Sequence, residues 1–311
     1  MYKGRPEASI NGGLAVAVPL ELHGMWLAHQ RHGRLPWKRL FQPAIALAEG
    51  GFPAHPYLVA SLSGENQTAA LLQWPAIRDT FLKKDGGKWR APRVNETCCK
   101  RPKLAELLTA VAEDGPQVLY TGRYAKPLVR DIQAAGGIIT AADLASAAAI
   151  VRSPIRQRVW GLDWIASPPP SSAVTVLAAL QILAGFEQPL AGSGSLGVHR
   201  TVEALKHAFA LRMSLGDPGP DAENPFVNLT AILSALHDSD FMSSLRTDIR
   251  DNALPLAHYG GRFNVTAAGL HPEDHGTSHI AVVDADRMAV SMTTTVNTGF
   301  GSKVLSASTG M

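Results

Sequence analysis

The stretch EDHGTSHIAVVDADRMAVSMTTTVN, from Glu273 to Asn297, contains two runs in which apolar and polar residues alternate, separated by the polar segment DADR. Successive side chains of a strand point to opposite faces, so this pattern predicts two antiparallel strands joined by a short turn. Threonine is frequent in strands because its branched side chain fits a pleated surface. The threonines therefore indicate a special chemistry only if their placement adds to that preference.

The register of the predicted strand pair follows from the same alternation. Pairing Asp284 with Met288 gathers one set of apolar residues on a single face, namely Ile280, Val282, Val290 and Met292. A shift by one residue would turn every side chain of one strand to the other face and mix apolar with polar residues. We therefore expect this register, with the apolar face packed in the core.

The opposite face begins with Thr277, which directly follows Gly276 and lies opposite Thr295, and Asn297 continues the same side. A threonine hydroxyl is a poor nucleophile unless a base removes its proton, and the α-amine of an N-terminal threonine can be that base. Cleavage before Thr277 would create this amine, and Gly276 leaves the peptide bond uncrowded. This arrangement suggests a threonine nucleophile released by self-cleavage.

Three histidines near the first strand offer a different chemistry, because His271, His275 and His279 are spaced four residues apart. On a helix this spacing could bring metal ligands together. Pro272 and Gly276 interrupt any helix there, and the strand register places His279 opposite Thr293. We therefore expect ordinary loop and strand histidines, with a metal-binding hydrolase as the alternative.

The composition excludes several classes of protein. The 311 residues are enough for one or two domains, and the fractions of hydrophobic residues (46%) and charged residues (18%) are ordinary for a globular protein. The net charge of +3, without a basic run, argues against nucleic acid as a partner. The longest apolar run, Ala173 to Phe186, is shorter than the roughly 18 residues of a membrane span, so it predicts a buried helix.

Glycine and proline residues mark the ends of the other predicted elements. Helical spacing of apolar residues predicts helices in residues 40–49, 104–114, 124–135 and 199–215. RQRVWGLDWIA, residues 156–166, predicts a strand hairpin, and Ser171 or Ser172 is well placed to cap the helix from Ala173. GSGSLG, residues 192–197, matches a dinucleotide-binding pattern, but it follows a helix where that motif requires a strand.

Four of the eight asparagines lie in glycosylation sequons, namely Asn66, Asn95, Asn228 and Asn264. We expect them to be exposed, mostly in loops, and to carry glycans acquired in the secretory pathway. No apolar signal region follows Met1. Cys98 and Cys99 are adjacent, so by themselves they cannot form the usual spaced disulfide or a metal cage.

The sequence resembles the γ-glutamyltransferase (glutathione hydrolase) family over nearly its whole length. The segments that carry the resemblance are LPWKRLFQPAIALAEGGF, GPQVLYTGRYAKPLVRDIQAAGGIITAADL, PPPSS, HAFALRMSLGDP and HGTSHIAVVDADRMAVSMTTTVNTGFGSK. HGTSH and AVSMTTTVN look like the plant and algal branch. The family consists of N-terminal-nucleophile hydrolases, made as a precursor and cut into large and small subunits. The resemblance implies an incomplete α/β fold of αββα layers with additional helices.

The resemblance also implies the roles of particular residues. The large-subunit region would span residues 1–276 and the start of the small subunit residues 277–311, together forming one domain. Thr277 would be the processing and catalytic nucleophile, and Thr295 would hydrogen-bond to it and help to bind the substrate. Asn297 would hold the α-amino group of the γ-glutamyl donor. No cofactor or metal is required.

The implied reaction begins with attack of Thr277 on the γ-glutamyl carbonyl of glutathione, a conjugate or another γ-glutamyl compound. Water, or an amino acid or peptide acceptor, then resolves the γ-glutamyl-enzyme. We expect both subunits to stay associated after cleavage, in the cell exterior (apoplast) or the vacuole. Association with the plasma membrane would need an N-terminal segment outside this chain.

Several family features have no counterpart in residues 1–311. They are the arginine region that binds the donor carboxylate, the asparagine-rich segment after STG, the double-serine substrate loop and the double-glycine oxyanion hole. In addition, PPPSSAV replaces the usual PPPSSGG, and Arg287-Met288 replaces the Gly-Asn common in the strand turn. Each lost oxyanion donor costs about 10²- to 10³-fold in rate. We therefore expect little turnover from this chain alone, and a non-catalytic remnant of the family is the alternative.

Overall fold

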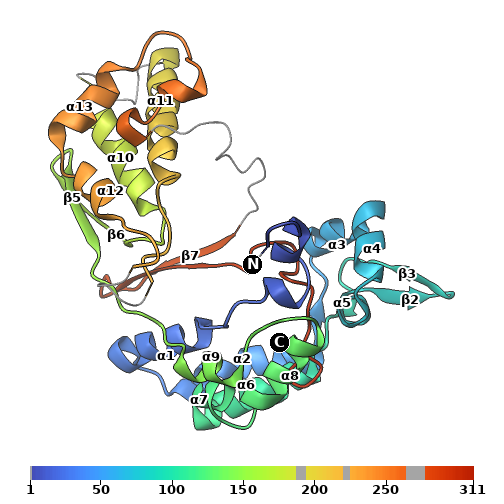
Figure 1. Cartoon of the computed structure of the whole chain (residues 1–311). Helices are drawn as coiled ribbons and strands as arrows, with labels where there is room; N and C mark the ends of the chain where they lie inside the picture. The colour runs from blue at the N-terminus through green and yellow to red at the C-terminus, as the bar shows by residue number, and fades with distance from the viewer. Residues whose placement is uncertain (1, 187–193, 220–224, 264–276) are drawn as a thin grey trace. The chain divides into compact units, whose positions relative to one another are not determined.

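The computed structural model describes residues 2–186, 194–219, 225–263 and 277–311 (Figure 1). The chain divides into two compact units. Unit 1 comprises Met1–Ala149 with His275–Met311, and unit 2 comprises Ile150–Asp274. This division differs from the expected single domain. The predicted subunit boundary before Thr277 is a cleavage site in the chain. A division into compact units does not test whether the chain is cut there.

Unit 1 is mostly helical and carries the strand pair predicted from the alternating sequence. Its elements are η1 (Pro6–Ser9), η2 (Gly13–Ala15), α1 (Glu21–His32), α2 (Trp37–Gly50), β1 (Phe52–Pro53), α3 (Pro56–Ser63), α4 (Glu65–Leu72), α5 (Pro75–Phe81), β2 (Lys83–Asp85), β3 (Lys88–Arg90), β4 (Thr97–Cys98), α6 (Pro102–Asp114), α7 (Gln117–Tyr120), α8 (Ala125–Ala134), α9 (Ala141–Ser146), β7 (Ser278–Val283) and β8 (Ala289–Thr294). The predicted helices α2, α6 and α8 are confirmed.

The main core of unit 1 forms where α2 and α6 lie side by side and α7, α8 and α9 join them (Figure 1). Leu107, Val111, Leu119 and Leu144 are fully buried there. Burying one such side chain contributes about 1.5–3 kcal/mol. Gly51 ends α2 at a φ of 76°, and a Cβ at this position would collide with the Cys98 carbonyl oxygen. The predicted glycine stop is thus required by conformation and by space.

Unit 2 contains a hairpin and a group of helices. Its elements are β5 (Ile155–Val159), β6 (Leu162–Ala166), α10 (Ala173–Ala184), α11 (Gly194–Arg212), α12 (Thr230–Ala235), α13 (Ser239–Thr247), η3 (Leu256–His258) and η4 (Gly261–Phe263). The predicted hairpin is confirmed, with Val159 paired to Leu162 across a two-residue turn at positive φ. Gly194–Gly197 belongs to α11, and the first residues of the glycine motif lie outside the described part.

The apolar helix after the prolines is confirmed as α10, whose Val174, Leu177 and Ile182 are fully buried against α11. The predicted serine cap is wrong. Ser172 occupies the N-cap position without a side-chain cap hydrogen bond, and its Oγ instead accepts a hydrogen bond from Arg212 Nε at 3.2 Å. The long arginine side chain thus competes for the oxygen that would otherwise bind the helix N-terminus.

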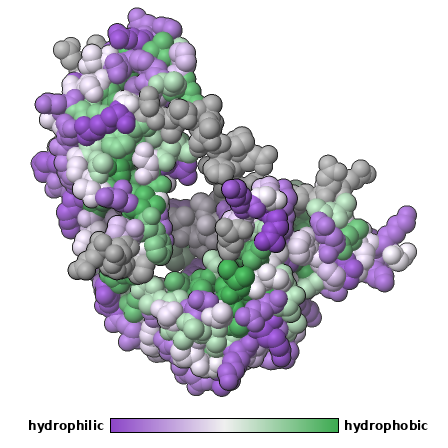
Figure 2. All heavy atoms as spheres, viewed as in Figure 1, coloured by the Kyte–Doolittle hydropathy of each residue, from purple (hydrophilic) through white to green (hydrophobic). Residues whose placement is uncertain are grey.

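The described strands form four separate two-stranded sheets, so the αββα layers are incomplete in this part of the chain. The expectation that the apolar face of β7 and β8 is core is wrong here. Ile280, Val282 and Val290 are 53%, 54% and 54% exposed, and none of them packs against a buried cluster of the described residues. Green apolar patches interrupt the hydrophilic surface in the space-filling view (Figure 2).

The C-terminal segment, residues 298–311, is tied to α8 by one carboxylate. Asp131 accepts hydrogen bonds from Ser306 Oγ at 2.7 Å and from the Ser308 backbone N–H at 2.8 Å. Burial alone would raise the pKa of Asp131, but the hydrogen bonds from Ser306, Ser308 and Arg130 together hold it below its usual value. The ionised carboxylate therefore favours the attached segment.

Cys98 and Cys99 are buried and form a disulfide with each other. The sequence analysis excluded a disulfide of the usual spacing, and this disulfide joins two neighbouring residues instead. In the described part of the chain, no helix combines the length and apolar character that crossing a membrane requires.

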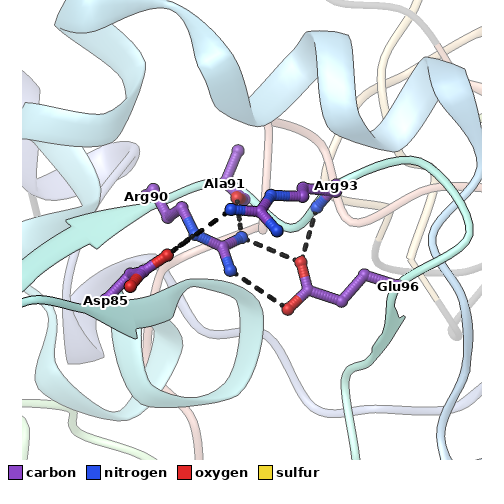
Figure 3. Close-up of polar contacts among 5 residues, drawn as sticks. All are labelled: Asp85, Arg90, Ala91, Arg93 and Glu96. Carbon is purple, nitrogen blue, oxygen red and sulfur yellow. Dashed lines mark hydrogen bonds and ion pairs between the residues drawn. The ribbon is translucent and has the colours of Figure 1, made fainter.

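An ionic cluster closes the loop after β3 (Figure 3). Arg90 donates to both carboxylate oxygens of Glu96, at 2.8 and 3.2 Å, and to Asp85 at 3.1 Å. The Arg93 backbone N–H donates to the same Glu96 carboxylate at 2.7 Å. The hydrogen bond from Arg90, followed by that from Arg93, lowers the pKa of Glu96 to about 2.

We predict that this cluster makes the stability of unit 1 depend on pH. Because the folded pKa of Glu96 is about 2 and the ordinary value is 4.5, its contribution is complete above pH 4.5 and is lost as the pH falls towards 2. Urea unfolding across this window should show a smaller loss of stability for Glu96→Gln than for the parent protein. Equal pH dependence of both proteins would contradict the prediction.

Candidate functional site

The pairing of β7 with β8 has the predicted register. Ile280 pairs with Met292 and Val282 with Val290. At the turn, the Asp284 backbone N–H donates to the Met288 carbonyl at 3.0 Å. The alternation of side chains therefore places the apolar residues on one face and Thr277 with Thr295 on the other.

His279 marks the polar face of the strand pair. Its Nδ1 lies 2.8 Å from Thr293 Oγ1 directly opposite, and its Nε2 lies 3.2 Å from Ser291 Oγ. Both ring nitrogens thus contact hydroxyl groups. His271 and His275 lie outside the described residues, and within the described ranges no group of three side chains is placed to hold a metal ion.

Thr277 directly precedes β7 and is exposed. Its Oγ1 donates to the backbone carbonyl of Thr294 at 2.9 Å. The expected partner Thr295 uses its hydroxyl differently, since its Oγ1 accepts from the Asn297 backbone N–H at 2.9 Å. The resemblance implied a hydrogen bond between the hydroxyl groups of Thr277 and Thr295. In the structure, Thr277 donates instead to the backbone carbonyl of Thr294, the residue before Thr295.

A pocket of about 410 Å³ brings the predicted site residues together. Thr277, Thr295 and Asn297 line it with Thr298 and Tyr57, and the remaining walls are Ser278, Thr294, Val296, Gly299 and Phe300. Hydroxyl and amide groups on one side can orient a polar substrate, while aromatic and aliphatic side chains can contact its apolar parts.

The loop after β8 shapes the pocket through an unusual backbone. Asn297, Phe300 and Lys303 have φ values of 73°, 61° and 61°. Thr298 Oγ1 donates to the Gly301 carbonyl at 2.8 Å and accepts from Lys303 Nζ at 3.1 Å. Burial lowers the pKa of Lys303. The contacts of Thr298 hold this loop in place, although the positive φ values within it are sparsely populated and cost free energy.

Sequence reasoning missed two residues near the site. Tyr57 lies on α3 and reaches the pocket from far away in the sequence. Glu21, the first residue of α1, accepts a hydrogen bond from Thr294 Oγ1 at 2.9 Å. Periodicity within a segment gives no signal for such contacts, because they depend on how distant helices pack.

We predict that the backbone of Asn297 contributes to stability separately from its side chain. Asparagine tolerates the left-handed region better than alanine, and glycine tolerates it best. Asn297→Ala should therefore lower the free energy of unfolding by about 1 kcal/mol more than Asn297→Gly. Urea denaturation of both variants tests this, and equal stability would show that φ imposes no cost here.

The chain is similar to known proteins over its whole length. A model of the gamma-glutamyltranspeptidase family matches residues 1–311. Glutathione hydrolase 2 of Arabidopsis thaliana is 39% identical over 313 residues, covering 100% of this chain and 51% of the relative. Glutathione hydrolase 5 proenzyme of Mus musculus is 33% identical, covering 96% of this chain and 51% of the relative. The chain thus spans about half the length of the curated relatives it matches.

The crystal structure of gamma-glutamyltranspeptidase from Helicobacter pylori matches the fold. Its TM-score is 0.68 at 26% identity, with 80% of this chain and 69% of that chain covered. The likeness confirms the α/β fold of N-terminal-nucleophile hydrolases. The match over the whole chain shows that the protein belongs to the gamma-glutamyltranspeptidase family.

Proposed function

We propose that this region carries the nucleophile of an enzyme that hydrolyses or transfers γ-glutamyl groups. The observation that carries the proposal is the exposed Thr277 hydroxyl, which lines one pocket with Thr295 and Asn297. Family membership supports the same chemistry. Glutathione and its conjugates, or other γ-glutamyl compounds, are the proposed donors, and water, amino acids and peptides are the proposed acceptors.

The first proposed step is self-cleavage before Thr277. Its hydroxyl oxygen attacks the Gly276 carbonyl carbon, the peptide C–N bond breaks, and an ester forms as the amine takes up the hydroxyl proton. Water hydrolyses the ester and leaves Thr277 with a free α-amine and a free hydroxyl. That amine is then the base that activates the hydroxyl.

The second proposed step is the reaction on substrate. The Thr277 oxygen attacks the γ-glutamyl carbonyl, and the departing amine receives the proton that the α-amine removed. Water or an acceptor amine then attacks the γ-glutamyl ester and regenerates the hydroxyl. In this scheme Thr295 helps to bind the substrate, and Asn297 holds the α-amino group of the donor.

Contacts within unit 1 support association of the large-subunit region, residues 1–276, with the small-subunit region, residues 277–311, after cleavage. The Gly12 backbone N–H donates to the Ser302 carbonyl at 2.8 Å, and the ring centroids of Phe81 and Phe300 lie 4.6 Å apart. The Asp131 hydrogen bonds join the same two pieces. These contacts are non-covalent and do not involve the bond before Thr277.

A non-catalytic remnant of the family is the second candidate, favoured by the exposed apolar face of β7 and β8. An uncovered strand pair of this kind promotes aggregation. The metal-binding alternative has less support, because both ring nitrogens of His279 already contact hydroxyl groups.

We predict that the full-length protein carrying this region is cut between Gly276 and Thr277. Thr277→Ala should abolish the cut because it removes the attacking oxygen, whereas Thr277→Ser should retain it as the matched control. Intact-mass spectrometry measures both. An uncut parent protein would favour the remnant, and equal cutting of the alanine variant would refute the nucleophile assignment.

We also propose that the protein passes through the secretory pathway, to the cell exterior or the vacuole, and is glycosylated. Asn95 and Asn228 are exposed and lie outside helices and strands, as expected of glycosylation sites. Asn66 lies in α4 instead of a loop, and Asn264 lies outside the described residues. The proposal therefore depends mainly on Asn95 and Asn228.

Expression in a eukaryotic host tests this proposal. Asn95→Gln and Asn228→Gln should each lower the mass by one glycan, whereas Asn252→Gln, outside any sequon, should not. Treatment with a glycosidase should abolish these differences. Unchanged masses for both sequon variants in secreted protein would overturn the glycosylation proposal.

A further inference from the structure

We propose that Glu21 is a positioning residue for the Thr277 hydroxyl, acting through Thr294; the inference rests on the proposed function. Thr294 makes two hydrogen bonds, one through its backbone and one through its side chain. Its backbone carbonyl accepts the Thr277 hydroxyl at 2.9 Å, and its own hydroxyl donates to Glu21 Oε1 at 2.9 Å. Glu21 therefore restrains the residue that orients the nucleophile.

The start of α1 is a firm point from which to exert this restraint. The buried Tyr120 hydroxyl donates to the Pro19 carbonyl at 2.6 Å and lies 3.3 Å from the His23 backbone nitrogen, which donates to it. These contacts hold the residues two before and two after Glu21. Leu20 and Leu22 also pack against the buried cluster of α2, α6 and α8.

His23 adds a further attachment, because its Nδ1 accepts the Ala149 backbone N–H at 2.9 Å. The hydrogen bonds of Tyr120 and His23 join α1 to segments more than ninety residues away. The Glu21 carboxylate thus projects from a backbone fixed by buried and partly buried contacts, although Glu21 itself is exposed.

Thr294 is the last residue of β8 and pairs with Ser278, so strand pairing holds its backbone but does not fix its side chain. A threonine side chain has several staggered rotamers, and the strand ends at this residue. A hydrogen bond to a carboxylate is stronger than one between neutral groups. The Glu21 contact therefore favours one rotamer of Thr294 and steadies the end of β8, where the Thr294 carbonyl accepts the Thr277 hydroxyl.

The geometry predicts an effect on rate and not on substrate binding. The pocket is lined by Thr277, Thr294, Thr295 and Asn297, and its described lining does not include Glu21. Losing the contact should misdirect the nucleophile while the walls that contact substrate remain. The same misdirection should slow the self-cleavage step, because both steps use the Thr277 oxygen.

The experiment compares Glu21→Ala, Glu21→Gln and Glu49→Ala in the full-length protein. Glutamine keeps an acceptor oxygen, and Glu49 is an exposed helical glutamate on α2 without a contact to Thr294. We expect Glu21→Ala to slow cleavage before Thr277 by about two- to tenfold, the range for one lost hydrogen bond. Glu21→Gln should recover most of the rate, and Glu49→Ala should match the parent protein.

Two further readouts separate positioning from a general structural role. In γ-glutamyl anilide hydrolysis, kcat should fall for Glu21→Ala while KM and the melting temperature stay within about twofold and a few degrees of the parent. Thr294→Val removes the donor, so adding Glu21→Ala to it should cause no further loss.

Each outcome decides one question. Parent-like cleavage and kcat in Glu21→Ala would overturn the inference while leaving the proposed function intact. A loss that Glu21→Gln does not recover, or one that adds fully to Thr294→Val, would also overturn it. If the parent protein is itself uncut and Thr277→Ala changes nothing, the proposed function fails instead.

Discussion

The antiparallel pairing between β7 and β8 is the constraint on which the candidate site depends. Because side chains alternate with a period of two, one register fixes the face of every residue in both strands. With Ile280 opposite Met292, Thr277 and Thr295 fall on the face that also carries His279. A slip by one residue would move Thr295 to the apolar face, away from Thr277.

The strand pair is held in place by contacts made at its ends. Thr294 connects it to α1 through Glu21, and the segment after β8 connects it to α8 through Asp131. The lowered pKa of Asp131 means that the attachment is strongest when its carboxylate is ionised, and that it weakens as acid protonates this group. A cut before Thr277 leaves all of these contacts available.

The apolar face of the same strands has no cover among the described residues. Apolar surface gains about 25 cal/mol for each Å² removed from water, so an exposed row of Ile280, Val282 and Val290 forgoes a substantial stabilisation. In a layered α/β fold such a face packs against another layer. The chain covers about half the length of its plant relative. Its described strands form two-stranded sheets only, and no larger sheet is present among them.

Local patterns in the sequence determined the elements and the faces of the strand pair. Alternation was sufficient for the register of β7 and β8, helical spacing and glycine stops for α2 and α6, and the segment RQRVWGLDWIA for the hairpin of β5 and β6. These features depend on residues close together in the chain, whose preferences are steric and therefore readable from order alone.

Only the tertiary structure decided which distant residues meet the strands and which faces are covered. Alternation predicted an apolar face but not its exposure, because burial depends on whether another element packs against it. Likewise, Glu21, Tyr57 and Asp131 reach the site region or its anchoring segment from separate helices, and no spacing rule relates them to Thr277. Their positions follow from the packing of α1, α3 and α8, where side chains far apart in sequence are brought together by the burial of a shared core.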